Sequence, residues 1–171
     1  KLLRQKALEI NEIANELGMH VRRWGLAHAL SESDEPLEIM IGEKGYLRKF
    51  EKFSKPIIKS LVANGYKIDS EKVQIAKTRM EEILADLNAI LIENNGRYLV
   101  GDRLGLADIA VCSMLAPLLE IVGTPWEREK QLAVSEQYHQ FKLAILDLPL
   151  GQYVKRIYEN ERRARVDWRG M

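Results

Sequence analysis

The residues best suited to chemistry gather near the end of the first predicted helix. His20, Arg22, Arg23, Trp24 and His28 fall within about two and a half helical turns. Trp24 and His28 are one turn apart on the face that carries the apolar repeat, so the cluster could bind a ligand. The alternative is that Trp24 belongs to the core, that His28 is a hydrogen-bonded histidine at the helix end, and that the arginines face solvent.

For the cysteine and the histidines, the sequence predicts neither a reactive thiol nor a metal site. Cys112 is the only cysteine, which excludes an internal disulfide and a cysteine-based zinc cluster and agrees with a reducing, cytoplasmic location. It lies in an apolar stretch without a cationic neighbour in the sequence, so we expect an inert buried thiol. His20, His28 and His139 have no carboxylate or cysteine at ligand spacing, and we expect no metal site.

Length and charge restrict the function classes only weakly. The chain has 171 residues, of which 46% are hydrophobic, enough for one core, and we expect residues 1–171 to form a single all-α domain. With 26 basic and 25 acidic residues, no global field attracts nucleic acid or an acidic membrane surface. No apolar run approaches a membrane span, and no signal peptide is visible. The first residue is Lys1 and not Met, which suggests that an upstream part is missing or not shown.

The element that must position these residues is an apolar stretch over residues 104–122. A helix that is apolar on all sides has to be buried, so we expect it at the centre of the bundle. If Gly105 is the N-cap, the Asp108 carboxylate can accept from the Gly105 N–H and meets the positive end of the helix dipole. Leu104 and Ile109 then occupy the hydrophobic-staple positions. We assign Asp108 a structural role and no catalytic one.

Helical periodicity predicts the elements before this stretch. A long helix runs from Lys1 to about Ala29. A short amphipathic helix over residues 46–61 follows, with Pro56 either kinking or dividing it. Asp69 and Ser70 supply the N-cap of a second long helix, which ends at residues 94–96, where a glycine suits the left-handed position after the helix.

Two further helices are predicted after the central stretch. A helical pattern begins with a capping box at Thr124 and continues to Leu148, with a break near Ser135, and Pro149 stops it. A last amphipathic helix contains residues 153–158. Within the central stretch, Pro117 removes a backbone bond and predicts a kink near Ser113.

The start of the central stretch carries a family resemblance. The segment LVGDRLGLADI resembles the signature of the C-terminal helical domain of cytosolic glutathione transferases, in which an "fLvGd" loop leads into an "lTlADia" helix start. The matching residues are Leu99, Val100, Gly101, Asp102, Leu106, Ala107, Asp108 and Ile109. The family usually has Ser or Thr where this chain has Gly105. At an N-cap this change costs only about a few tenths of a kcal/mol of stability. The resemblance implies a bundle of about five to seven helices around a buried central helix.

The resemblance also implies a function that this chain cannot carry alone. In that family an N-terminal thioredoxin-like domain holds glutathione and supplies a Tyr, Ser or Cys that engages its thiol, and no βαβ pattern occurs here. The chain then is the helical half of a two-domain protein, usually a homodimer, that acts on small electrophilic or disulfide substrates as a glutathione transferase or thiol reductase. This domain alone is not expected to be catalytic.

By the same resemblance, the end of the first helix covers the electrophile pocket. The corresponding residues are His20, Arg23, Trp24, Ala27 and His28. For Trp24 and His28, a place in the pocket and a place in the core both remain open. The alternative function is a non-catalytic interaction module, because similar helical domains are attached to translation factors and aminoacyl-tRNA synthetases.

Overall fold

The fold is built entirely from helices in the part of the chain that the structure describes. The structure is a computed structural model, and it describes residues 1–32, 51–65, 68–124 and 135–161. The helices are α1 (Leu2–Glu32), α3 (Glu51–Gly65), α4 (Ser70–Glu93), α5 (Leu106–Leu119), α6 (Glu136–Asp147), α7 (Pro149–Arg156) and the π-helix η2 (Ile157–Glu161). The described ranges contain no strand and six α-helices, so the predicted all-α class is confirmed.

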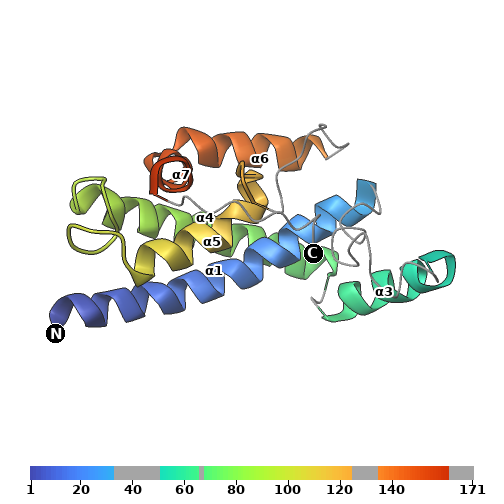
Figure 1. Ribbon diagram of the computed structural model, residues 1–171. Helices are drawn as coiled ribbons and strands as arrows, with labels where there is room; N and C mark the ends of the chain where they lie inside the picture. Colours follow the sequence, from blue (N-terminus) through green and yellow to red (C-terminus); the bar gives the residue numbers. More distant parts are fainter. Residues whose placement is uncertain (33–50, 66–67, 125–134, 162–171) are drawn as a thin grey trace.

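The helices are arranged around α4 and α5. Helix α1 packs along both of them, and α7 packs against both and against α6. Figure 1 shows α4 running antiparallel to α1, α5 running parallel to it, and α6 and α7 on the opposite side from α1. Helix α3 is drawn to one side of this bundle (Figure 1).

The core follows the apolar repeats of the sequence. Helix α1 contributes a buried row at heptad-like spacing: Ile10, Ala14, Leu17, Val21 and Trp24. Helix α5 is buried along most of its surface, as predicted for the central helix. One strip of α5 is nevertheless open to solvent, with Leu106 48% and Ile109 57% exposed. The predicted hydrophobic staple between Leu104 and Ile109 stays a prediction.

Local hydrogen bonds define the ends of α4 as the sequence predicts. The Asp69 side chain caps the helix by accepting from the Lys72 N–H at 2.9 Å. After the helix, Gly96 adopts a left-handed φ of 70°. Asn94 then donates from Nδ2 to the carbonyls of Tyr98 and Gly101, at 2.8 Å each, and thereby shapes the loop that leads to α5.

Several predicted details fall partly outside the described residues. Helix α3 begins at Glu51 and passes through Pro56 undivided, whereas residues 46–50 are not described. The capping box after Thr124 falls on residues 125–134, which are not described either. Helix α6 follows the N-cap Ser135, at the predicted break. The kink that Pro117 predicts near Ser113 stays a prediction.

The corner between α6 and α7 depends on contacts that no local motif reveals. Leu148 is both the C-cap of α6 and the N-cap of α7, and its side chain makes no capping hydrogen bond. Instead Asn88 of α4 accepts the Leu150 N–H at 3.0 Å. Gly151 lies so close to α6 that an added Cβ would be 2.0 Å from the Ile145 carbonyl oxygen. Only glycine fits this corner without moving backbone.

We therefore predict that Gly151→Ala is strongly destabilising. The methyl group would overlap the backbone of α6, and such overpacking costs about 3 kcal/mol of unfolding free energy. Urea unfolding followed by far-UV circular dichroism measures the loss. Gly25→Ala is the matched control, because no atom lies within 4 Å of its added Cβ, and it should gain about 0.5 to 1 kcal/mol from helix propensity. Equal midpoints for the two variants would contradict the prediction.

Candidate functional site

Trp24 is the centre of an aromatic cluster, which we define as Trp24, His28, Tyr138 and Phe141. The Trp24 ring centroid lies 4.4 Å from that of His28 and 5.5 Å from that of Tyr138, on which it stacks. Phe141 meets Trp24 edge-on at 4.9 Å. Offset stacking and edge contacts of this kind stabilise beyond the area they bury. The cluster therefore joins the end of α1 to α6.

Polar contacts hold the rim of the aromatic cluster. His28 Nδ1 lies 2.8 Å from Ser135 Oγ, and this serine also caps α6 by accepting the Tyr138 N–H at 3.2 Å. The Tyr138 hydroxyl donates to the Leu118 carbonyl at the end of α5 at 3.1 Å. Lys77 of α4 lies 5.8 Å from the centroid of the Phe141 ring. Contacts from α4, α5 and Ser135 thus orient the rings.

The structure brings together only some of the five residues predicted to bind substrate. Trp24 and His28 are in contact, but Trp24 is 1% exposed and lies within the core. Arg23, Ala27 and His28 are half-buried at the same end of α1. His20 is 6% exposed, and its ring lies near Glu16, on the side of α1 that faces Arg79 of α4.

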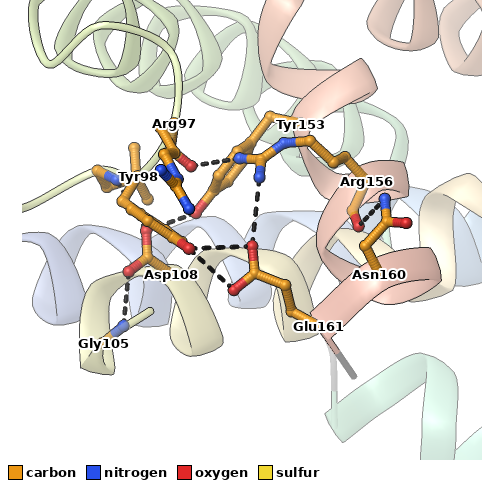
Figure 2. Close-up of polar contacts among 9 residues, drawn as sticks. Arg97, Tyr98, Gly105, Asp108, Tyr153, Arg156, Asn160 and Glu161 are labelled. Atoms are coloured by element: carbon orange, nitrogen blue, oxygen red, sulfur yellow. Dashed lines mark hydrogen bonds and ion pairs between the residues drawn. The ribbon is translucent and has the colours of Figure 1, made fainter. Parts of the chain in front are cut away.

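The Asp108 carboxylate accepts three hydrogen bonds within the described core (Figure 2). Its Oδ2 accepts the N–H of the N-cap Gly105 at 2.8 Å, as the spacing predicts. Its Oδ1 accepts the Leu99 N–H at 2.7 Å and the Tyr153 hydroxyl at 2.5 Å. The carboxylate is fully buried and thus joins the helix start, the preceding loop and α7. Sequence spacing revealed the first bond only, because Tyr153 is far away in the chain.

The thiol and the phenol beside Asp108 stay protonated at neutral pH. Burial, assisted by the Asp108 charge, raises the pKa of Cys112 to about 12. Burial also raises the pKa of Tyr153, and the neighbouring Cys112 and Asp108 add to the shift. Since a thiolate is the reactive form, Cys112 is a poor nucleophile here. Tyr153 is therefore a hydrogen-bond donor to the Asp108 carboxylate.

A second layer of contacts fastens the C-terminal π-helix over this site (Figure 2). Arg156 donates to the Arg97 carbonyl and, at 3.2 Å, to the Glu161 carboxylate. The Tyr98 hydroxyl also donates to Glu161, at 3.1 and 3.2 Å from its two oxygens. The Arg156 guanidinium lies over the rings of both Tyr98 and Tyr153, in the geometry of a cation–π contact. The loop before α5 is thereby fixed by contacts with Arg156 and Glu161 as well as by Asp108.

Two surface hollows flank the first turn of α1. One, of about 380 Å³, lies between α1, the end of α4 and residues 99–101. The other, of about 230 Å³, lies between the start of α1 and the start of α5. Both are lined by Leu3, Val100 and Gly101, and neither includes any of the five predicted substrate-binding residues.

The described residues, 1–32, 51–65, 68–124 and 135–161, hold neither a metal-binding cluster nor a membrane-spanning helix. Nowhere in these ranges do three or more His, Cys, Asp or Glu side chains gather in a way that could hold a metal ion. Among the described helices, none combines the length and the apolar character that crossing a bilayer requires.

The arrangement around α5 defines the class of the protein. A capped, buried helix lies between a long first helix and the C-terminal helices of the described chain, so this is an all-α bundle organised around α5. Comparison with known families matches residues 46–148, more than half of the chain, to the family described as glutathione S-transferase, C-terminal domain. The chain belongs to this family. Searches of the curated proteins and of the solved structures gave no match.

We predict that the Asp108 carboxylate is a major source of stability. Asp108→Ala leaves three donors without their acceptor, and unsatisfied buried groups cost about 1 to 3 kcal/mol each, so unfolding free energy should fall by about 3 kcal/mol or more. Tyr153→Phe removes one donor only and should cost about 1.5 kcal/mol. Urea midpoints measure both losses.

The exposed Asp102, on the same loop, provides the control for this prediction. Asp102→Ala should change unfolding free energy by less than about 0.5 kcal/mol. If Asp108→Ala behaves like Asp102→Ala, the buried carboxylate is not the organising contact of the loop.

Proposed function

We propose that this chain is the helical half of a glutathione-dependent transferase or thiol reductase, and that the end of α1 forms part of the wall of its substrate pocket. Family membership over residues 46–148 is the observation that carries the proposal. The half-buried placement of Arg23, Ala27 and His28 at one end of α1 supports it, because partly exposed side chains on a rigid helix can contact a small substrate.

The proposed reaction begins with the thiolate of glutathione. In the transferase reaction it attacks an electrophilic carbon, so that a C–S bond forms as a leaving group departs; with a disulfide it forms a mixed disulfide and releases a thiolate. Cys112 and Tyr153 are buried and protonated, and do not fit the role of activating that thiol. We assign the activating Tyr, Ser or Cys, and most of the glutathione site, to a thioredoxin-like domain outside this sequence.

The open strip of α5 is where we propose that this domain packs. Leu106 and Ile109 are one turn apart and largely exposed. Leu106 and the exposed Leu3 also line the hollow between the starts of α1 and α5. Contiguous exposed apolar side chains mark interaction surfaces. We further propose a cytoplasmic homodimer, in keeping with the family.

Within the proposed pocket, the five residues of α1 have different tasks. Arg23, Ala27 and His28 would contact the electrophile directly. Trp24 would not contact the electrophile but would position the His28 imidazole, which its ring contacts. His20, on the side of α1 that meets α4, would act on the pocket only through the position of the helix.

We expect the full-length protein to be active with glutathione. It should bind glutathione in isothermal titration calorimetry and should turn over at least one member of a panel of chloroarenes, epoxides, peroxides and disulfides. A protein that neither binds glutathione nor turns over any thiol substrate would instead be a non-catalytic interaction module of the same fold, with the open strip of α5 as its partner surface.

Substitutions at the end of α1 distinguish a role in the pocket from a role in the core. His28→Ala should raise the KM for the electrophile about 5-fold, the effect of about 1 kcal/mol of lost contact, and should leave the KM for glutathione unchanged. Trp24→Ala should mainly lower stability, by about 3 to 5 kcal/mol, because it empties a buried site. His139→Ala, a half-buried histidine on α6, is the control. If His28→Ala changes the urea midpoint and neither KM, the aromatic cluster is core alone.

A further inference from the structure

His20 is a buried titratable group that the proposed reaction does not use. Its ring nitrogen Nδ1 is buried and has no hydrogen-bond partner. Its Nε2 lies 3.7 Å from Glu16 Oε1, one turn earlier on α1. This distance is too long for a good hydrogen bond. The neutral ring is therefore tolerated in the interface, although neither ring nitrogen makes a good hydrogen bond.

The same carboxylate oxygen is already engaged by α4. Arg79 reaches Glu16 Oε1 with Nη2 at 2.7 Å and with Nε at 3.3 Å. Arg79 is itself held by Glu82, at 2.5 Å from Nη1. We call His20, Glu16 and Arg79 the α1–α4 clasp, because the three side chains join the two helices from the buried interface outward to the surface.

A proton on His20 would meet an unfavourable setting. The charged groups that face the ring are Glu16 and Arg23 on α1 and Arg79 on α4, so one carboxylate opposes two permanent cations. The new Nδ1–H would also need an acceptor in a place that offers none. Burial, the largest cause, together with the two arginines lowers the pKa of His20 below its usual 6.5, and Glu16 offsets only part of this.

We propose that His20 makes the α1–α4 clasp acid-sensitive, so that protonation of the ring loosens the packing of α1 against α4. The charged ring needs an acceptor at Nδ1, and separation of the two helices beside Glu16 and Arg79 would let water reach this atom. Trp24 follows His20 by one turn on α1, so the loosening extends toward the aromatic cluster. The device is a property of the fold and stands apart from the proposed enzymatic function.

The direction of the pH dependence follows from proton linkage. In the unfolded chain His20 has its ordinary pKa of 6.5, whereas the folded value is lower. Above that pH both states are neutral at His20 and stability is full. As the pH falls below it, the unfolded or opened state binds the proton first, and stability decreases until the folded pKa is reached. One proton changes the equilibrium at most about tenfold per pH unit.

The test uses the full-length protein at about pH 7.5 and about pH 5.5, on either side of the histidine range. Hydrogen exchange, corrected for intrinsic rates, should show faster opening of α1 and α4 peptides at the lower pH. In His20→Leu, which keeps the bulk and removes the titration, this acid-induced increase should shrink by up to about tenfold. His139→Leu should retain it, as the control.

An NMR titration of the wild-type protein makes the test independent of whether His20→Leu folds. The His20 ring should titrate below pH 6.5, and Glu16→Gln should lower its midpoint further because Glu16 is the neighbour that favours the charged ring. A His20 midpoint at or above that value would overturn the proposal. So would equal acid-induced opening in His20→Leu and in the wild type.

Discussion

The buried Asp108 carboxylate accepts hydrogen bonds from three separate segments of the chain. Within the described residues, Asp108 forms no ion pair. Three hydrogen-bond donors from separate segments compensate for its burial instead. Burying a charge without such compensation costs several kcal/mol, which is on the order of the whole unfolding free energy of a small domain. The carboxylate is thus tolerated only when the loop, the start of α5 and α7 are all in place. A single group thereby makes three parts of the chain interdependent.

Glycine at the N-cap of α5 is compatible with this arrangement. A Ser or Thr there would add a side-chain bond to the first turn, but the reciprocal bond from the Gly105 N–H to Asp108 needs no side chain at position 105. Leu99 and Tyr153 add their own donors to the same carboxylate. The chain therefore keeps the motif's Asp at position 108, where the carboxylate accepts three hydrogen bonds. It departs from the motif at Gly105, where only a side-chain cap is lost.

Local features were predictable from the sequence, and contacts between distant segments were not. The Asp69 cap, the left-handed Gly96 and the Gly105–Asp108 bond each involve residues within a few positions, so their spacing is informative. The Tyr153 bond to Asp108 joins residues 45 positions apart. Apolar composition also could not tell which side of α5 stays open. For the candidate site, helical spacing placed His20 and Trp24 near each other but could not show that different helices cover them.

The shared corner at Leu148 has a consequence for cooperativity. Helix α7 has only eight residues, too few to persist alone in water, and the Leu150 N–H in its first turn is accepted by Asn88, near the C-terminal end of α4. Opening α4 removes that acceptor, and loss of α7 in turn takes the Tyr153 donor away from Asp108. Helices α4 and α7 therefore belong to one unfolding unit, although Asn88 and Leu150 are 62 positions apart in the chain.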